Sequence, residues 1–537
     1  MSHAQTAPAV DPGAAAMPRK QALLVFIGLM LAMLLGTLDT QIVATAMPTI
    51  SGDLGGVSQF AWVSTAYLLT FSVTTPLYGK LGDLLGRKRV FVFAIVVFLI
   101  GSVLCGAAGS MTQLIVYRAV QGVGAGGLTV SIFAILGDLF SPREGARYQS
   151  YATGTFAVSS VSGPLLGGLI TDHLGWRWAF YINMPVGALA LFMVVSFLSL
   201  PARRGTPRID YAGIVALGGA VSCLVLLTNW AGSEYAWGSS VIVSLAVATL
   251  VLGGLWFGAE RRAAEPVVPL RMFGSSTFNI SNVVAFVGGF ISIGALNYLA
   301  LYLQMVTGTS SQNAGLLMLP MTAGMLLATM GTGHFMTKTG QYKWYPAASM
   351  AVSSLALYLL STMTNSTSFA VASAFMAVLG LGAGLSQQVT VVVSQSAVEL
   401  RDIGAATSTV TFTRMLGTSL GASLFGVILN NGLADHSSKL TEGASISPEA
   451  VQRLPEAARD AYTSAYADAL SSVFLTALPL TLTGLVVALF LKKLPLRSGG
   501  GPGRGPAGPG KAEGNVPHPA NSPDTSASRE NPEKGTA

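Results

Sequence analysis

Charged side chains are scarce in this sequence. Asp, Glu, Lys and Arg make up 10% of the 537 residues, whereas hydrophobic residues make up 51%. A soluble domain usually carries about 25% charged residues, so this chain has too little charge to cover a soluble surface. Its apolar residues instead come in runs of about 20, the length that spans the hydrocarbon core of a bilayer. The composition therefore predicts an all-α, polytopic membrane protein.

Residues that bind metals or form disulfides are also few. The two cysteines, Cys105 and Cys223, each lie inside an apolar run, which excludes a disulfide framework and a cysteine metal site. The five histidines show no metal-ligand spacing, and no nucleophile–base pair is visible. We expect no metal, no cofactor and no catalytic residue. The net charge of +7 does not indicate nucleic acid, because membrane proteins keep Lys and Arg on cytoplasmic loops.

Fourteen apolar segments are predicted to be transmembrane helices. They are 22–48, 60–79, 90–108, 111–137, 149–171, 177–200, 210–230, 239–259, 277–304, 312–332, 345–362, 367–392, 404–431 and 468–491. The Ala/Pro-rich residues 1–18 and the Gly/Pro-rich residues 495–537 are predicted to be disordered tails, because they cannot bury enough apolar surface to offset the entropy of ordering.

The distribution of basic residues sets the orientation. Most Lys and Arg residues fall in loops on one side of the predicted spans, whereas four fall on the other side: Arg177, Lys439, Arg453 and Arg459. Cytoplasmic loops carry the excess of Lys and Arg. We therefore expect a multi-pass protein of the cell membrane, with both termini in the cytoplasm.

A weak internal repeat divides the chain. Gly79 and Gly86 after the second span match Gly333 and Gly340 after the tenth, and other glycines recur in the same order. The repeat predicts an N-terminal six-helix half (19–204), an inserted helix pair (205–262) and a C-terminal six-helix half (263–494) with an external loop at 432–467. Repeated halves around a midplane site are a recurring transporter architecture.

The stretch GVGAGG at 122–127 has the letters of a dinucleotide-binding motif. That motif requires a preceding strand and a following helix. Here the glycines lie inside an apolar span, one turn after Arg118. Small residues in a membrane helix allow close helix packing, and this is the interpretation we adopt.

Several stretches together resemble a known family. They are LDTQIVATAMPTI (38–50), GKLGDLLGRKR (79–89), RAVQGVGAGG (118–127), GPLLGGLI (163–170) and WRWAFYINMP (176–185). In combination they are similar to the major facilitator superfamily, and specifically to its fourteen-helix drug:proton antiporters. The resemblance implies the major facilitator fold, with two six-helix halves plus two inserted helices. We expect the protein to function as a monomer.

The resemblance assigns a gating role to the motif after the second span, through Gly79, Asp83, Gly86 and Arg87. These residues would hold neighbouring helix ends closed and release them during the cycle. Topology alone explains the basic residues of the motif but does not explain the acid Asp83. The second-half counterpart, GHFMTKTGQYK at 333–343, lacks that acid.

The motif in the fifth span is typical of exporters within the superfamily. Pro164 removes a backbone hydrogen bond, and Gly163, Gly167 and Gly168 allow bending and close contact. Ordinary helix packing is the alternative to a hinge between the two halves. The matching Gly417 and Gly421 of span thirteen are the expected partner surface of this hinge.

Two opposite charges are predicted to meet inside the membrane. A lone Arg there costs at least about 2.5 kcal/mol. Arg118 lies about seven residues, or roughly 10 Å, from the outer end of its span, and Asp39 about nine residues, or roughly 14 Å. Their depths agree, so we expect the two to pair; the alternative is that backbone or water satisfies each separately. Further residues expected to line a central cavity are Gln121, Gln387, Gln388 and Arg414.

A buried carboxylate next to a cation is suited to proton coupling. Burial favours the neutral acid and the cation favours the charged form, so a changing contact can load and release a proton. We expect a drug:proton antiporter that exports lipophilic small molecules by alternating access. One acid against two arginines in the cavity would favour neutral, weakly acidic or monocationic substrates over dications. The alternatives are a proton symporter that imports a metabolite, and a membrane-embedded enzyme or non-transporting sensor.

Overall fold

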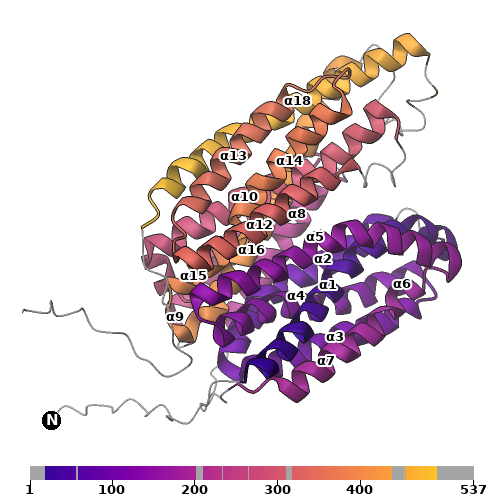
Figure 1. Ribbon diagram of the computed structural model, residues 1–537. Helices are drawn as coiled ribbons and strands as arrows, with labels where there is room; N and C mark the ends of the chain where they lie inside the picture. Colours follow the sequence, from indigo (N-terminus) through magenta and orange to yellow (C-terminus); the bar gives the residue numbers. More distant parts are fainter. Residues whose placement is uncertain are drawn as a thin grey trace, which may run out of the picture.

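The computed structural model describes residues 18–55, 59–200, 210–232, 234–263, 265–309, 317–437, 451, 453 and 455–492. Long helices running side by side dominate these ranges (Figure 1). An α-helix satisfies its backbone N–H and C=O groups within one segment, which the absence of water in a bilayer demands. The predicted all-α membrane architecture is confirmed.

The helices form two bundles and a pair. The first bundle contains α1 (Arg19–Leu54), α2 (Phe60–Leu85), α3 (Arg87–Gly106), α4 (Met111–Leu139), α5 (Pro142–His173), α6 (Trp178–Tyr181) and α7 (Asn183–Phe197). The pair is α8 (Tyr211–Trp230) and α9 (Ser240–Arg262). The second bundle contains α10 (Ser276–Thr307), α12 (Leu319–Thr339), α13 (Trp344–Ser361), α14 (Phe369–Ser386), α15 (Val389–Ser396), α16 (Ile403–Ser437) and α18 (Glu456–Leu489).

Helix length and composition support membrane crossing for some of the fourteen predicted spans. Within the described ranges, nine helices are long and apolar enough to cross a membrane, or ten if the bent α5 is one span. Two of these nine include a short turn, at residue 182 between α6 and α7 and at 387–388 between α14 and α15. The number of fourteen crossings stays a prediction.

Both helices that border the expected external loop 432–467 extend into it. α16 continues to Ser437, and α18 begins at Glu456, twelve residues before the predicted start of its span. The segment EAARDAYTSAYADAL (456–470) is rich in alanine, the residue with the highest helix propensity, so it stays helical beyond the apolar run. The loop is therefore shorter than expected. The predicted tails, 1–18 and 495–537, lie outside the described residues except for Pro18.

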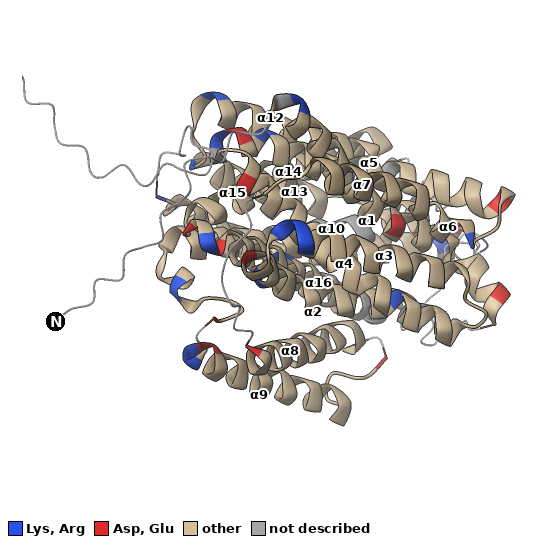
Figure 2. Cartoon of the chain, turned by 90° about the horizontal axis from the view of Figure 1, so that it is seen from below, with Lys and Arg blue, Asp and Glu red and all other residues tan. Residues whose placement is uncertain are grey.

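The two bundles approach each other at one end. α1 begins and α18 ends there, and we call it the terminal end (Figure 1). α2 packs against α16, and α5 packs against α12. Charged residues colour mainly the two ends of the molecule and are sparse along its length (Figure 2). α8 and α9 lie together along one edge, with α8 against α2 (Figure 2).

Candidate functional site

A polar network fills the interior of the first bundle around Asp39. Its members come from four helices: Asp39 from α1, Ser102 from α3, Arg118 and Gln121 from α4, and Asn183 from the start of α7. Asp39 is fully buried and Arg118 is 2% exposed. Buried charges require partners, so the contacts within this network decide whether the pair is tolerated.

Both carboxylate oxygens of Asp39 accept hydrogen bonds. Arg118 Nη1 donates to Asp39 Oδ2 at 2.7 Å and to Gln121 Oε1 at 2.6 Å. Gln121 Nε2 and Asn183 Nδ2 each donate to Asp39 Oδ1 at 2.8 Å. Ser102 Oγ accepts from both amides, at 2.7 and 3.1 Å. The pair is therefore hydrogen-bonded on several sides, which offsets the cost of burying two charges.

The guanidinium of Arg118 also lies over the ring of Tyr67 on α2, 4.1 Å from the ring centroid. Such a cation–π contact contributes more when it is desolvated. Arg118 Nε has no hydrogen-bond partner among the described residues. The Tyr67 ring is therefore a second neighbour that would stabilise the positive charge of Arg118 if the carboxylate of Asp39 were protonated.

Asp39 and Arg118, which were predicted to pair because they lie at similar depths, are in contact in the structure. Sequence reasoning missed Ser102 and Asn183. Asn183 lies within the quoted WRWAFYINMP stretch, so a signal for it existed. Nothing in the sequence around Ser102 distinguishes it from other serines in spans.

The expectation that these charges line a central cavity is wrong in this structure. Asp39, Arg118 and Gln121 are at most 2% exposed, because the polar faces of α1 and α4 turn toward α3 and α7 within their own bundle. The pair is sealed and internally neutral. The count of one acid against two arginines in the cavity therefore fails, since neither member of the pair is accessible.

Arg414 is a partly exposed arginine of the second bundle. It lies on α16, and its Nη2 donates to the carbonyl oxygen of Gln387 at 2.7 Å and to Thr390 Oγ1 at 2.6 Å. Both acceptors are neutral. Gln388, by contrast, is fully buried and donates to the carbonyl oxygen of Thr329 on α12 at 2.9 Å, so it does not line an open cavity. Arg414 and Gln387 remain cavity candidates.

Asp83 joins the two bundles at the terminal end. It lies near the end of α2 and is 4% exposed. Its carboxylate accepts from the backbone N–H groups of Gly404 at 3.1 Å and Ala405 at 2.9 Å, at the start of α16. A helix N-terminus carries unsatisfied N–H groups and positive potential, so an anion stabilises it. This cross-bundle contact gives a physical basis for the expected gating role.

The other gating residues support Asp83. Arg87 Nη2 donates to Asp83 Oδ1 at 2.9 Å, and Arg87 Nε lies 2.5 Å from Asp138 Oδ2 at the end of α4. Gly86 has φ 95°, a conformation that favours glycine. A Cβ on Gly79 would lie 2.6 Å from the carbonyl oxygen of Gly404, so α2 and α16 can approach this closely only with glycine there. Asp138 was missed because it follows the predicted span.

A second contact between the bundles joins α5 and α12 at the same end. Arg143 Nε donates to the carbonyl oxygen of Thr337 at 2.6 Å, and its Nη2 to the carbonyl oxygen of Lys338. These carbonyls belong to the last turn of α12, where a cation is favourable. The second half lacks the acid of the first, and here a basic residue of α5 binds a helix C-terminus instead. Both contacts close the terminal end.

The expected partner of the fifth-span motif is wrong. A Cβ on Gly163 would lie 2.3 Å from Gln41 Cβ, which places the motif against α1. The matching Gly417 contacts the backbone of Phe286 on α10. Each motif therefore packs against the first helix of its own bundle, because the repeat reproduces the same helix pair twice. α5 bends by 43° near Pro164, and Gly167 packs on Ile42, while Gly168 has no neighbour within 4 Å of an added Cβ.

We expect Asp83→Asn to slow transport while leaving substrate binding near its wild-type strength. The neutral amide weakens the contact with α16 by about 1 kcal/mol, which is roughly fivefold in the equilibrium between closed and open terminal ends. Transport rate and substrate affinity, measured by uptake and fluorescence quenching, separate the two effects. Asp138→Asn, which removes a carboxylate next to Arg87 within the first bundle, is the comparison variant and should slow transport less. A large loss of affinity in Asp83→Asn would place Asp83 in the substrate site.

Comparison with known proteins agrees with this architecture. Residues 29–422 match the model of the Major Facilitator Superfamily. An uncharacterized MFS-type transporter of Mycobacterium tuberculosis is 41% identical over 88% of this chain and 70% of its own length. Multidrug resistance protein 3 of Bacillus subtilis is 34% identical, over 87% of this chain and 95% of its own. The multidrug transporter protein MdtP of Bacillus subtilis is 33% identical, over 88% and 93%.

Solved structures show the same fold at low sequence identity. The human organic anion transporter MFSD10 matches with a TM-score of 0.61 and 16% identity, over 88% of this chain and 100% of that one. The proton:xylose symporter XylE matches with a TM-score of 0.58 and 15% identity, over 88% and 96%. At such identity the likeness concerns the fold alone.

Proposed function

Because the chain belongs to the major facilitator superfamily and is a multi-pass membrane transporter, we propose that it exports lipophilic small molecules in exchange for protons. We also propose that transport proceeds by alternating access and that the terminal end faces the cytoplasm. The functional unit is a monomer. Two relatives that are at least 33% identical are named as multidrug proteins. Their names support the substrate class.

The buried network around Asp39 is the observation that carries the proton coupling. Asp39 is held by Arg118, Gln121 and Asn183, so its charge is compensated while the terminal end is closed. A proton on Asp39 would cancel its attraction for Arg118, leaving the guanidinium with Gln121 and Tyr67. Because these residues lie on α1, α2, α4 and α7, that change alters contacts among four helices.

For alternating access, protonation of Asp39 must shift the equilibrium between the closed and the open terminal end. The terminal end is closed here by the contact of Asp83 (α2) with the start of α16 and by the contact of Arg143 (α5) with the end of α12. In the proposed cycle, a proton enters from outside while this end is closed. Protonation of Asp39 favours its opening, the proton leaves to the cytoplasm, and Arg118 pairs again. A substrate moves outward during the return, so each direction of movement is linked to one state of Asp39.

Transport into inverted vesicles tests the proposed function. With an acid interior, a drug:proton antiporter accumulates a lipophilic dye inside, and collapsing the gradient releases it. A symporter would not accumulate the dye under this gradient, and a membrane enzyme or sensor would not move it. Absence of gradient-driven accumulation for a panel of such dyes would overturn the proposal.

Arg414 is expected to set the charge preference of transport. Its acceptors are the neutral Gln387 carbonyl and Thr390 hydroxyl, and the Asp39–Arg118 pair is sealed, so an acidic substrate gains a partner where a cation gains none. We expect Arg414→Gln to lower the affinity for weakly acidic substrates about tenfold, through loss of one charge-assisted hydrogen bond, and to change that for monocations less than twofold. Equal losses for both classes, measured in one vesicle preparation, would contradict this role.

A further inference from the structure

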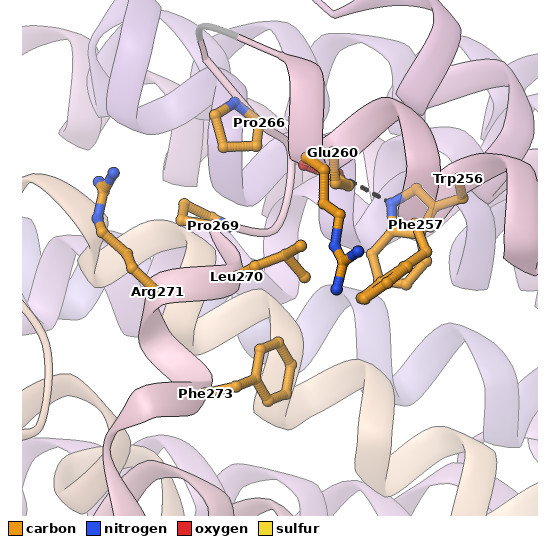
Figure 3. Close-up of a pocket in the computed structure, with 9 residues that line it drawn as sticks. Trp256, Phe257, Glu260, Pro266, Pro269, Leu270, Arg271 and Phe273 are labelled. Atoms are coloured by element: carbon orange, nitrogen blue, oxygen red, sulfur yellow. Dashed lines mark hydrogen bonds between the residues drawn. The ribbon is translucent and has the colours of Figure 1, made fainter.

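A groove of about 730 Å³ lies between the end of α9 and the short 3-10 helix η2 (Leu270–Gly274), outside the network described above. Its lining residues come from α9, from the connecting segment and from η2 (Figure 3): Trp256, Phe257, Glu260, Arg261, Pro266, Pro269, Leu270, Arg271 and Phe273. The lining is mostly aromatic and aliphatic, with one acid and two arginines. A hydrophobic surface with opposite charges in one groove suits an amphipathic ligand.

The groove lies where a spanning helix ends. α9 is long and apolar enough to cross a membrane, and only 6% of its most apolar window is buried, since α9 packs mainly on α8. Glu260 lies two residues before the end of α9, roughly 3 Å along the axis. From the length and composition of α9, we place the membrane–water boundary at this position. A ligand that reaches it from the bilayer is a lipid, with its headgroup at the level of Glu260 and Arg261.

One carboxylate oxygen of Glu260 has no hydrogen-bond partner in the described ranges. It is 4% exposed, and its Oε1 accepts from Trp256 Nε1 at 2.9 Å and from the backbone N–H groups of Val267 and Val268 at 3.1 Å (Figure 3). Its Oε2 has no hydrogen-bond partner among the described residues. Buried polar atoms are rarely left unpaired, so this oxygen points to an ammonium donor that enters through the groove.

Arg261 supplies the opposite charge. Its guanidinium lies 4.4 Å from the centroid of the Phe257 ring, and no carboxylate in the described ranges forms an ion pair with it. Arg271 is already bound to Asp402 by two arginine nitrogens. The free charges of the groove are therefore one acid and one base. A headgroup with both an ammonium and a phosphate matches them, whereas an anionic headgroup would leave Glu260 unpaired and repelled.

We propose that this groove binds a phospholipid with a primary ammonium headgroup, phosphatidylethanolamine in chemical class. Its ammonium donates to Glu260 Oε2, and its phosphate contacts Arg261. Its acyl chain lies along Trp256, Phe257 and Leu270. A quaternary ammonium carries the same charge but no N–H, so it cannot make the bond to Glu260.

The groove is also connected to the gate at the terminal end. Glu265, in the segment between α9 and η2, pairs with Lys80 of α2 at 2.7 Å. Arg271 of η2 pairs at 2.8 Å with Asp402, which directly precedes α16. Glu265, next to the lining residue Pro266, thus contacts α2, and the lining residue Arg271 contacts the residue that precedes α16. A lipid that orders the wall of the groove stabilises the closed terminal end.

Lipid binding to the purified full-length protein tests the site without any transport. Phosphatidylethanolamine, phosphatidylcholine and phosphatidylglycerol with identical acyl chains are compared by native mass spectrometry. We expect phosphatidylethanolamine to bind about tenfold tighter than phosphatidylcholine, as for a hydrogen bond to a charged group. Glu260→Gln keeps an acceptor for Trp256, Val267 and Val268 and should reduce this preference to less than twofold. Tighter binding of phosphatidylglycerol, or a preference that survives Glu260→Gln, would overturn the proposal.

Two arginine variants keep the test decisive if Glu260→Gln fails to fold. Arg261→Gln should weaken phosphatidylethanolamine and phosphatidylcholine alike, because both carry the phosphate, and should keep their ratio. Arg262→Gln is the matched control, since Arg262 adjoins Arg261 on α9 but does not line the groove. Equal effects of the two arginine variants would refute the site. Loss of proton coupling in other experiments would leave this result unaffected, because binding alone is measured.

A separate measurement tests whether lipid binding in the groove stabilises the closed terminal end. Spin labels at Glu144→Cys on α5 and Thr339→Cys at the end of α12 report the width of the terminal end. In wild type, phosphatidylethanolamine should shift the distance distribution toward the short, closed state relative to phosphatidylcholine. Glu260→Gln should abolish the shift. A distribution that is independent of the lipid would disprove the coupling.

Discussion

Asp39→Asn is expected to abolish proton-driven export while leaving the protein folded and able to exchange substrate. The amide oxygen still accepts from Gln121 and Asn183, while Arg118 loses its carboxylate partner and keeps Gln121 and the Tyr67 ring. An amide does not take up or release a proton in the accessible pH range, and no step can then be driven by the gradient. Exchange of labelled for unlabelled substrate needs no net proton movement and should persist.

The measurement compares gradient-driven uptake with substrate exchange in the same proteoliposomes. Asp53→Asn is the matched control, because Asp53 lies on the same helix but forms a half-exposed ion pair with Arg177 at the opposite end. It should transport like wild type. Full antiport by purified Asp39→Asn would remove Asp39 as the proton site.

Arg118→Ala is expected to be the most destabilising substitution in the network. Removing one member of a buried pair leaves an uncompensated charge, which typically costs about 3–5 kcal/mol. Arg118 is 2% exposed and contacts Asp39, Gln121 and Tyr67, so water cannot readily replace it. Arg118→Lys keeps the cation but loses the planar fork, and should retain part of both stability and turnover.

A charge-neutral double variant separates stability from transport. Asp39→Asn with Arg118→Gln removes both charges and should recover most of the stability lost in Arg118→Ala, because the buried charge is gone. Gradient-driven uptake should stay absent. Thermal unfolding in detergent gives the first quantity and proteoliposome uptake the second. Wild-type stability in Arg118→Ala would show that the pair is not coupled in the way its distances indicate.

The two charges illustrate how far sequence reasoning reaches. Similar depth in two spans predicted that Asp39 and Arg118 meet, because depth follows from counting residues along a helix of fixed rise. Which way the pair faces was predicted wrongly. Rotation of α1 and α4 about their axes is set by packing against α3 and α7, and the amides of Gln121 and Asn183 enter only through that packing.

In the contacts between the bundles, too, one part was predictable from the sequence and another part was not. The acid Asp83 was identified from its place among basic residues, yet its partners are backbone N–H groups of Gly404 and Ala405, more than 300 residues later. Backbone groups leave no mark in the sequence. Glu260 drew no attention there either, because an acid near the end of a span is ordinary until its orphaned oxygen and the groove beside it are visible.

The sequence by itself determined the class of the protein. Apolar runs, basic loops, repeated glycines and family motifs give an all-α transporter of two related halves, because hydrophobicity and turn chemistry are local properties of the chain. The tertiary structure alone decided which charges are sealed, which helices the glycine motifs join and where the bundles close. These depend on how helices are rotated and packed against one another, and that information is distributed over residues far apart in the chain.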